Sequence, residues 1–323
     1  MKNAHRKPAG NSLRLMVFSL AAAASALLLL PGFWGGTRVE ANHPVLVEGN
    51  CDSPVPGATI VAAGMCGDYD GDGRTGTSED FDGADRIFGT LNAALGAVDL
   101  GTAINPTTAQ FNGRIIIVTS GRFAETLYIG NNSPDPAVGS SSPGHVTIEA
   151  APGVYADLDA VLQGDPAGGN GTRQGRPGIQ INYLPAFSGR VVTLRNLTIR
   201  NYQTGVLAMG SSRVIIDNCR FENNLSSNIL AGGSADVVVS NSLIESAGFR
   251  IGTANSSGVG RGVVVTNDAK MRLMETTISN NKGAGIYNTA PAANVVLFKV
   301  STYFNKPNVL GVVTTSSDPN HSF

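Results

Sequence analysis

Charged side chains are scarce in this sequence. Asp, Glu, Lys and Arg make up 15% of the 323 residues, and the formal net charge at pH 7 is −1. Binding to nucleic acid requires Lys and Arg residues clustered on one surface, and no such cluster follows the N-terminal segment. The composition therefore excludes a nucleic-acid partner, whereas it is compatible with a sugar ligand.

Long apolar runs are also missing, except for one near the N-terminus. Four basic residues precede and border the run "LMVFSLAAAASALLLL", and small and turn-forming residues follow it up to Ala41. This order is typical of a bacterial secretory signal over residues 1–41. A retained membrane anchor is the alternative, because the run approaches the ~20 residues that span a bilayer. We expect a secreted or periplasmic protein with no membrane contact after cleavage.

Cysteine is nearly absent, with three residues in the whole chain. Cys51 and Cys66 lie close together in the segment that would be exported, where an oxidising compartment favours a disulfide. Cys219 lies alone in an apolar pattern, so we expect a buried and unreactive thiol.

The second half of the chain contains a repeat. Five segments, which begin at Val191, Arg213, Asp236, Lys270 and Asn294, align by their apolar residues with a period of two. The first inward column has members 22, 23, 34 and 24 residues apart, namely Val192, Val214, Val237, Met271 and Val295. Two further columns follow in register: Leu194, Ile216, Val239, Leu273 and Leu297, then Ile199, Phe221, Ile244, Ile278 and Thr302. A period of two with β-branched residues indicates strands.

Each repeat ends at a position suited to a turn. These positions are Asn201, Asn223, Ser246, Asn280 and Phe304. Asn tolerates left-handed backbone angles, and we expect stacked Asn amides to form a hydrogen-bonded ladder. Short strands with no helix between them form coils that stack about 4.8 Å apart, and equivalent strands of neighbouring coils pair into parallel sheets. The sequence therefore predicts an all-β, right-handed parallel β-helix, with a leucine-rich solenoid or a β-sandwich as alternatives.

A family resemblance extends this interpretation. The stretches "GTLNAALGAVDLG", "GRIIIVTSGRFAETLYI" and "VTIEAAPGV", followed by the five repeats, resemble the pectin-lyase-like superfamily over about residues 89–316. The resemblance implies a capping helix in which Ile87, Leu91, Ala94 and Leu95 cover the open end of the core. It also implies a carbohydrate substrate.

The catalytic groups of that superfamily are hard to identify. "GRFAE" at 121–125 and "GRP" at 175–177 resemble motifs of pectin methylesterases, but the catalytic aspartates of that family are not seen. A polysaccharide lyase needs a base to remove a weakly acidic proton, and Arg173 and Arg176, with Asp165 nearby, are the candidates. The alternative is that these arginines only solvate a Gly-rich loop.

An acidic stretch, "DYDGDGRTGTSE", fits the spacing D-x-D-x-D-G-x5-E of a calcium loop. Its predicted ligands are the side chains of Asp68, Asp70, Asp72 and Glu79 and the carbonyl of Arg74. A solvated acidic turn is the alternative. Because the loop is far in sequence from the candidate bases, we expect structural Ca²⁺ that orders the N-terminal cap.

The expected layout is a signal peptide at 1–41, an N-terminal segment with the disulfide, calcium loop and cap helix at 42–105, the β-helix at 106–317 and a tail at 318–323. Two functions follow: an exported protein that binds or processes an extracellular polysaccharide, or a non-catalytic surface or matrix protein. Outward aromatic residues would favour sugar stacking, and Tyr202, Tyr287 and Tyr303 are the candidates. Nothing in the sequence indicates the oligomeric state.

Overall fold

The computed structural model describes residues 45–47, 86–88, 90–100, 112–118, 120–130, 145–159, 176–249 and 259–318. The chain divides into two units, residues 1–41 and 42–323, and all the described residues belong to the second. No helix within the described ranges is long and apolar enough to cross a membrane. The predicted calcium loop, the cysteines at 51 and 66, and Arg173 lie outside these ranges.

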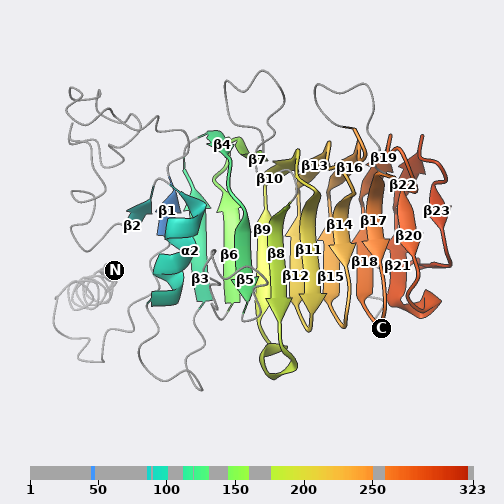
Figure 1. The fold of residues 1–323 in the computed structure, drawn as a ribbon, viewed down its shortest axis with the longest axis horizontal. Helices are drawn as coiled ribbons and strands as arrows, with labels where there is room; N and C mark the ends of the chain where they lie inside the picture. The colour runs from blue at the N-terminus through green and yellow to red at the C-terminus, as the bar shows by residue number, and fades with distance from the viewer. Residues whose placement is uncertain are drawn as a thin grey trace, which may run out of the picture. The chain divides into compact units, whose positions relative to one another are not determined.

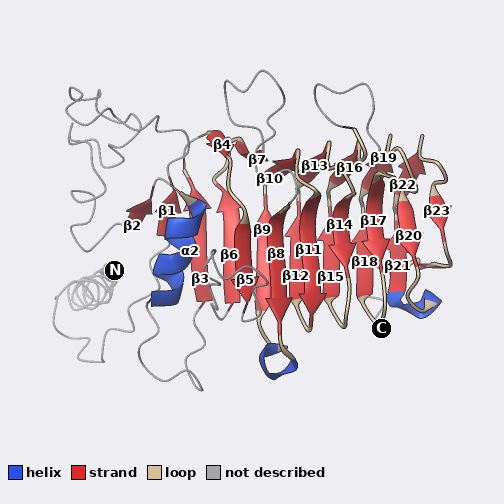
Figure 2. Cartoon of the chain, in the orientation of Figure 1, coloured by secondary structure: helices blue, strands red, loops and turns tan. Residues whose placement is uncertain are grey.

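Parallel strands dominate the described part of the chain and form three sheets (Figures 1 and 2). Sheet A contains, in spatial order, β2 (Arg86–Phe88), β1 (Val45–Val47), β3 (Asn112–Ile117), β6 (His145–Ala150), β9 (Val191–Arg195), β12 (Arg213–Asp217), β15 (Asp236–Ser240), β18 (Lys270–Met274), β21 (Val295–Phe298) and β24 (Thr314–Thr315). Sheet B contains β4 (Gly121–Phe123), β7 (Ala156–Asp159), β10 (Leu197–Arg200), β13 (Arg220–Glu222), β16 (Leu243–Glu245), β19 (Thr277–Ser279) and β22 (Ser301–Tyr303). Sheet C contains β5 (Leu127–Gly130), β8 (Pro177–Tyr183), β11 (Thr204–Gly210), β14 (Ser227–Ala231), β17 (Arg261–Val265), β20 (Ile286–Asn288) and β23 (Val309–Leu310).

One coil of the solenoid consists of an A, a B and a C strand in chain order, and each strand pairs with its counterparts in the neighbouring coils. The fold is therefore a right-handed parallel β-helix, as predicted. Two 3-10 helices, η1 (Pro185–Phe187) and η2 (Ala292–Asn294), each precede an A strand.

The three predicted inward columns are confirmed. Val192 pairs with Val214, and Val214 with Val237, and the other two columns keep the same register. Their members are buried, except for Leu297 and Thr302 at the C-terminal end, which are partly buried. Each fully buried Val, Leu or Ile stabilises the coil by about 1.5–3 kcal/mol.

The predicted turn positions are also confirmed. Each lies at the corner between sheets B and C with a left-handed φ: 64° at Asn201, 56° at Asn223, 56° at Ser246, 55° at Asn280 and 56° at Phe304. The corner between sheets A and B has the same conformation in a single residue, namely Asn196, Asn218, Asn241, Glu275 and Lys299. Most of these residues are Asn, whose short polar side chain tolerates this region, whereas other residues are destabilised by about 1–2 kcal/mol there.

The asparagine ladder exists, but one position later than predicted. Asn224 and Asn281 immediately follow the left-handed residues and turn their amides into the interior, where both are buried. Asn305 occupies the same position in the last coil, and the Asn281 amide donates to Asn305 Oδ1 at 2.8 Å. At this corner the residue after the left-handed one is therefore the one that stacks along the axis.

The ladder changes its source of amide in one coil. Ala247 occupies the corner position there and has no amide, but Asn228 in β14 supplies one. Asn224 Nδ2 donates to Asn228 Oδ1 at 2.8 Å, and Asn228 Nδ2 donates to Asn281 Oδ1 at 3.2 Å. The ladder is therefore continuous across the substituted coil.

Glycine takes the place of Asn228 in neighbouring coils. A Cβ on Gly205 would lie 2.9 Å from Asn224 Nδ2, and a Cβ on Gly262 would lie 2.8 Å from Asn281 Nδ2. The ladder amide needs this space, so these positions of sheet C accept a side chain only where the corner residue of the next coil is small.

Helix α2 (Leu91–Leu100) covers the N-terminal end of the core, as predicted, with Leu91, Ala94 and Leu95 buried. The prediction was wrong for Ile87, which lies in strand β2 and not in the helix. Strands β1 and β2 extend sheet A beyond the first complete coil. These strands have three residues each, too few to show an alternating pattern in the sequence.

The glutamate of "GRFAE" holds this cap. Glu125 accepts hydrogen bonds from the backbone N–H groups of Leu91 and Asn92, at 2.9 Å each. These N–H groups begin the helix and have no partner within it, so the carboxylate acts as a cap delivered from the loop between β4 and β5. Phe123 of the same motif is buried in the core.

Candidate functional site

Charged side chains gather on the outward face of sheet B. The strand register defines two outward columns: Arg122, Asp157, Thr198, Arg220 and Leu243 in the first, and Asp159, Arg200, Glu222, Glu245, Ser279 and Tyr303 in the second. Seven ionised residues thus occupy neighbouring positions over five coils. We call them the sheet B charge cluster: Arg122, Asp157, Asp159, Arg200, Arg220, Glu222 and Glu245.

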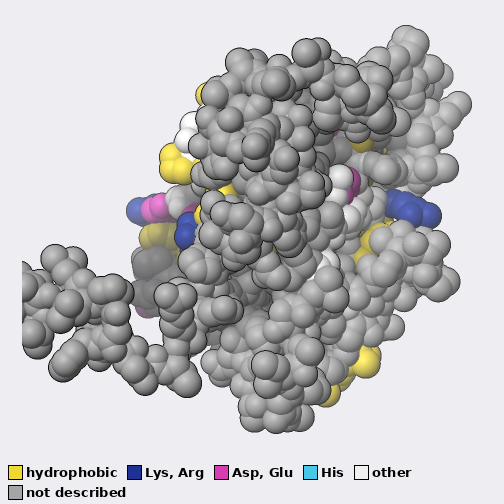
Figure 3. Space-filling model, turned by 90° about the vertical axis from the view of Figure 1, so that its left-hand side faces the viewer, with side chains coloured by type: hydrophobic (Ala, Val, Ile, Leu, Met, Phe, Trp, Pro, Cys, Tyr) yellow, Lys and Arg dark blue, Asp and Glu magenta, His cyan; other side chains and the backbone are white. Residues whose placement is uncertain are grey.

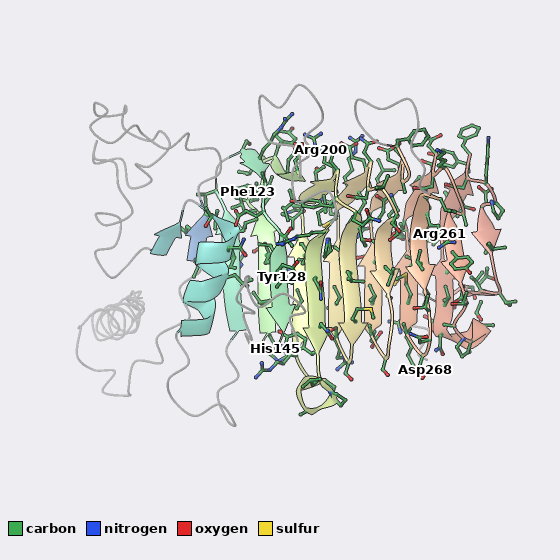
Figure 4. The ribbon with its side chains drawn as sticks, viewed as in Figure 1. Phe123, Tyr128, His145, Arg200, Arg261 and Asp268 are labelled. Carbon is green, nitrogen blue, oxygen red and sulfur yellow. The ribbon has the colours of Figure 1, made fainter. Side chains whose placement is uncertain are left out.

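Arg200, labelled in Figure 4, contacts three of the four carboxylates of this cluster. Its guanidinium contacts Asp157 Oδ2 at 2.8 Å, Asp159 Oδ2 at 3.0 Å and Glu222 Oε1 at 3.1 Å. Asn201 donates to the second oxygen of Asp159 at 2.7 Å. Burial acts to lower the pKa of Arg200, but the carboxylates of Asp157, Glu222 and Asp159 outweigh it, so this pKa lies above its ordinary value. Arg200 is therefore a fixed positive charge that holds three carboxylates.

The solvent-facing groups of the cluster are arginines. The side chains of Arg122 and Arg220 are 47% and 52% exposed, whereas that of Asp159 is 3% exposed and that of Glu222 is 13% exposed. Arg220 also contacts Glu245 Oε1 at 2.8 Å. The face thus offers outward N–H donors above a layer of carboxylates that are paired with arginines. Such donors bind carboxylate and hydroxyl oxygens.

In the end view of Figure 3, a Lys or Arg side chain lies beside an Asp or Glu side chain at one edge of the described surface. The described residues contain no group of three or more His, Cys, Asp or Glu placed to hold a metal ion.

Arg176, one of the two predicted bases, lies directly before β8, and its carbonyl accepts a hydrogen bond from the Gln203 N–H at 3.0 Å. Its place is the corner between sheets B and C, where β7 ends at Asp159. Its predicted partner Arg173, and Asp165, lie outside the described residues. The pairing of the two arginines stays a prediction.

Two of the three candidate aromatics are unsuited to stacking on a sugar. Tyr202 was expected to face outward, but it is buried and its hydroxyl donates to the Glu125 carbonyl. Tyr287 does face outward, on sheet C, but the Arg261 guanidinium lies 4.0 Å from its ring centroid. Tyr303 is exposed at the end of sheet B.

Two other chemically versatile side chains make contacts within the fold. His145 accepts a hydrogen bond from the Val191 N–H at 3.2 Å, between two A strands. Cys219 is buried, and burial raises the pKa of its thiol to about 12. The Cys219 thiol is therefore protonated at neutral pH and shielded from solvent.

The sequence alone reveals only part of the charge cluster. The repeat alignment places Arg195 beside Asp217 and Arg200 beside Glu222 in neighbouring coils, and the strand register agrees. Arg122, Asp157 and Asp159 precede Val191, where the aligned repeats begin. Extending the alignment back to "GRF" and "ADLD", the sequences of β4 and β7, would have added the three missing charges of the first coils.

Comparison with known proteins supports the fold. Residues 170–320 match the family model described as "right handed beta helix region". No curated protein and no solved structure matched the chain. The match covers the regular coils from β8 onward, and the description of the family names no substrate.

Proposed function

We propose that this chain is an exported protein that binds an extracellular polysaccharide along the outward face of sheet B. The observation that carries the proposal is the sheet B charge cluster. A solenoid repeats its side-chain positions about every 4.8 Å, and a polysaccharide also presents its oxygens periodically. A row of fixed donors and acceptors along the axis therefore suits an extended sugar chain.

The pairing of the charges favours binding over turnover. Each carboxylate of the cluster contacts an arginine: Asp157 and Asp159 contact Arg200, Glu245 contacts Arg220, and Glu222 contacts both. A general base must accept a proton in the transition state, and a carboxylate held by a guanidinium is a weaker base. Lyase chemistry would depend on Arg176, which lies at the neighbouring corner, and on its predicted partner Arg173.

The outward arginines indicate the charge of the polysaccharide. Arg122 and Arg220 belong to one column, three coils or about 14 Å apart. Guanidinium groups bind carboxylates in a bidentate manner. We therefore propose that acidic polysaccharides, such as those built from uronates, bind more tightly than neutral ones.

Gel retardation of the purified protein in polygalacturonate and in a neutral β-glucan tests this proposal. Arg220→Gln should weaken retention in polygalacturonate by about fivefold or more, a loss of about 1 kcal/mol. Arg213→Gln is the matched control, because Arg213 is similarly exposed, at 55%, and pairs with Asp236 on sheet A.

Equal loss in both variants would show that net charge, and not sheet B, carries the binding. Ultraviolet absorbance of unsaturated products in the same samples would reveal lyase activity. If activity appears, Arg176→Ala should abolish it.

A further inference from the structure

Phe304 is an exception at the corner between sheets B and C. The same position holds Asn201, Asn223, Ser246 and Asn280 in the preceding coils, all with a left-handed φ. Phe304 has a φ of 56°, and a bulky residue in this region is a conformational outlier. The residue is also 77% exposed, so burial in the described protein does not offset the strain. A strained and exposed aromatic residue suggests a function.

Tyr303 completes an aromatic pair. Its ring lies 5.3 Å from that of Phe304, with the two planes at 89°, and 43% of the residue is exposed. This edge-to-face packing orients both rings while leaving ring surface open to solvent. The two side chains therefore form a small, ordered apolar surface.

This surface continues the sheet B charge cluster. Tyr303 is the last member of the outward column that contains Arg200, Glu222 and Glu245. Four coils separate Tyr303 from Arg200, which is about 19 Å along the axis. A chain that lies along sheet B and contacts the charges would reach the aromatic pair.

We propose that Tyr303 and Phe304 form a stacking site for one pyranose ring of the polysaccharide, an inference that rests on the proposed function above. A pyranose ring has an apolar face of C–H groups and a rim of hydroxyls, which fits an aromatic surface at the end of a polar column. A protein partner would need about 800 Å² on this side, whereas a buried aromatic side chain contributes only about 150–250 Å². The size of the pair matches a single sugar ring.

Phe304→Asn provides the decisive variant, because it restores the residue found at three equivalent corners. It should raise the melting temperature, since Asn tolerates the left-handed conformation. It should also weaken retention in polygalacturonate gels by about five- to tenfold. Opposite changes in stability and binding would be difficult to explain by a structural role alone.

Two further variants complete the experiment. Tyr303→Ser matches Ser279, which occupies the same register position in the preceding coil, and should weaken binding to a similar extent. Leu310→Asn is the control, because Leu310 is an exposed apolar residue of the last coil on sheet C. It should leave binding unchanged.

The outcomes separate this inference from the proposed function. If Arg220→Gln weakens binding and Phe304→Asn does not, the polysaccharide function stands and the stacking site is wrong. A lower melting temperature for Phe304→Asn, or a change in its sedimentation coefficient, would overturn the inference in favour of a packing or self-association role. If the wild-type protein is retarded by neither polysaccharide, both proposals fail.

Discussion

Asn228 supplies the ladder amide that Ala247 lacks, and this substitution of one amide for another can be tested quantitatively. Asn228→Gly removes three hydrogen bonds of a buried side chain: one accepted from Asn224 at 2.8 Å, and two donated to the Glu245 carbonyl at 2.9 Å and to Asn281 at 3.2 Å. Each contributes about 1 kcal/mol, and a glycine in a strand costs about 0.5–1 kcal/mol more. We expect the variant to lose about 3–4 kcal/mol of unfolding free energy.

The second single variant should also be unstable, for a different reason. Ala247→Asn would place an amide in the space that the Asn228 side chain fills, and overpacking of a core costs about 1–3 kcal/mol. The double variant Asn228→Gly with Ala247→Asn restores the arrangement of the neighbouring coils, where Gly262 lies against Asn281. We expect its free energy of unfolding to lie within about 1 kcal/mol of the wild-type value. This implies a favourable coupling energy of several kcal/mol between the two substitutions.

Urea unfolding of the four proteins, followed by circular dichroism, measures these differences as a double-mutant cycle. Asn228→Ala with Ala247→Asn is the matched control. This control removes the same side-chain hydrogen bonds, but the alanine Cβ at position 228 would crowd the new amide at position 247. A Cβ on Gly205 would crowd Asn224 in the same way. The control should therefore not restore stability. Additive losses in the Asn228→Gly double variant would refute the claim that one amide replaces the other.

Glu125→Ala should speed hydrogen exchange in the first turn of α2 and lower stability by about 1 kcal/mol, because the helix loses its cap. Cys219 should resist iodoacetamide at pH 8 and react only as the protein unfolds in urea, since its raised pKa keeps the thiol protonated; labelling of the native protein would contradict its burial. Val237→Asp should unfold the coils, because an unpaired buried charge costs several kcal/mol, and unchanged thermal melting would contradict the inward column. Calcium should raise the melting temperature of the wild type, and Asp70→Ala with Asp72→Ala should abolish that increase; calorimetry that detects no calcium binding would remove the site.

The sequence was sufficient to predict the β-helix because its inward columns obey a strict geometry. Val214 and Val237 occupy equivalent points of a repeating lattice, so the spacing of apolar residues contains the register. The left-handed corners were predictable for the same reason, since Asn recurs where the backbone needs it. Phe304 could be assigned to its corner only by counting from Asn280, because its side chain contradicts the local preference.

The candidate site was harder to predict because it depends on contacts between coils of unequal length. Asp159 and Arg200 are separated by 41 residues in the chain, including an insertion that obscures the repeat. Tyr202 shows the opposite difficulty: an aromatic residue next to a turn resembles a surface residue in the sequence. In the structure it occupies the corner position that asparagines fill in later coils, where the interior has room for a ring.

The asparagine ladder gives the solenoid an electrical polarity. From Asn224 through Asn228, Asn281 and Asn305 to Asn308, each amide donates one N–H to the side-chain oxygen of the next, so every ladder oxygen accepts from the N-terminal side. The amides of Asn224, Asn281 and Asn305 also donate back to the carbonyls of Ile199, Ile244 and Ile278. Aligned amide dipoles reinforce one another, as they do along an α-helix. The positive end of this row lies in the last coil, the coil that also carries Tyr303 and Phe304. An anionic sugar that stacks there would meet a favourable field from these side-chain dipoles.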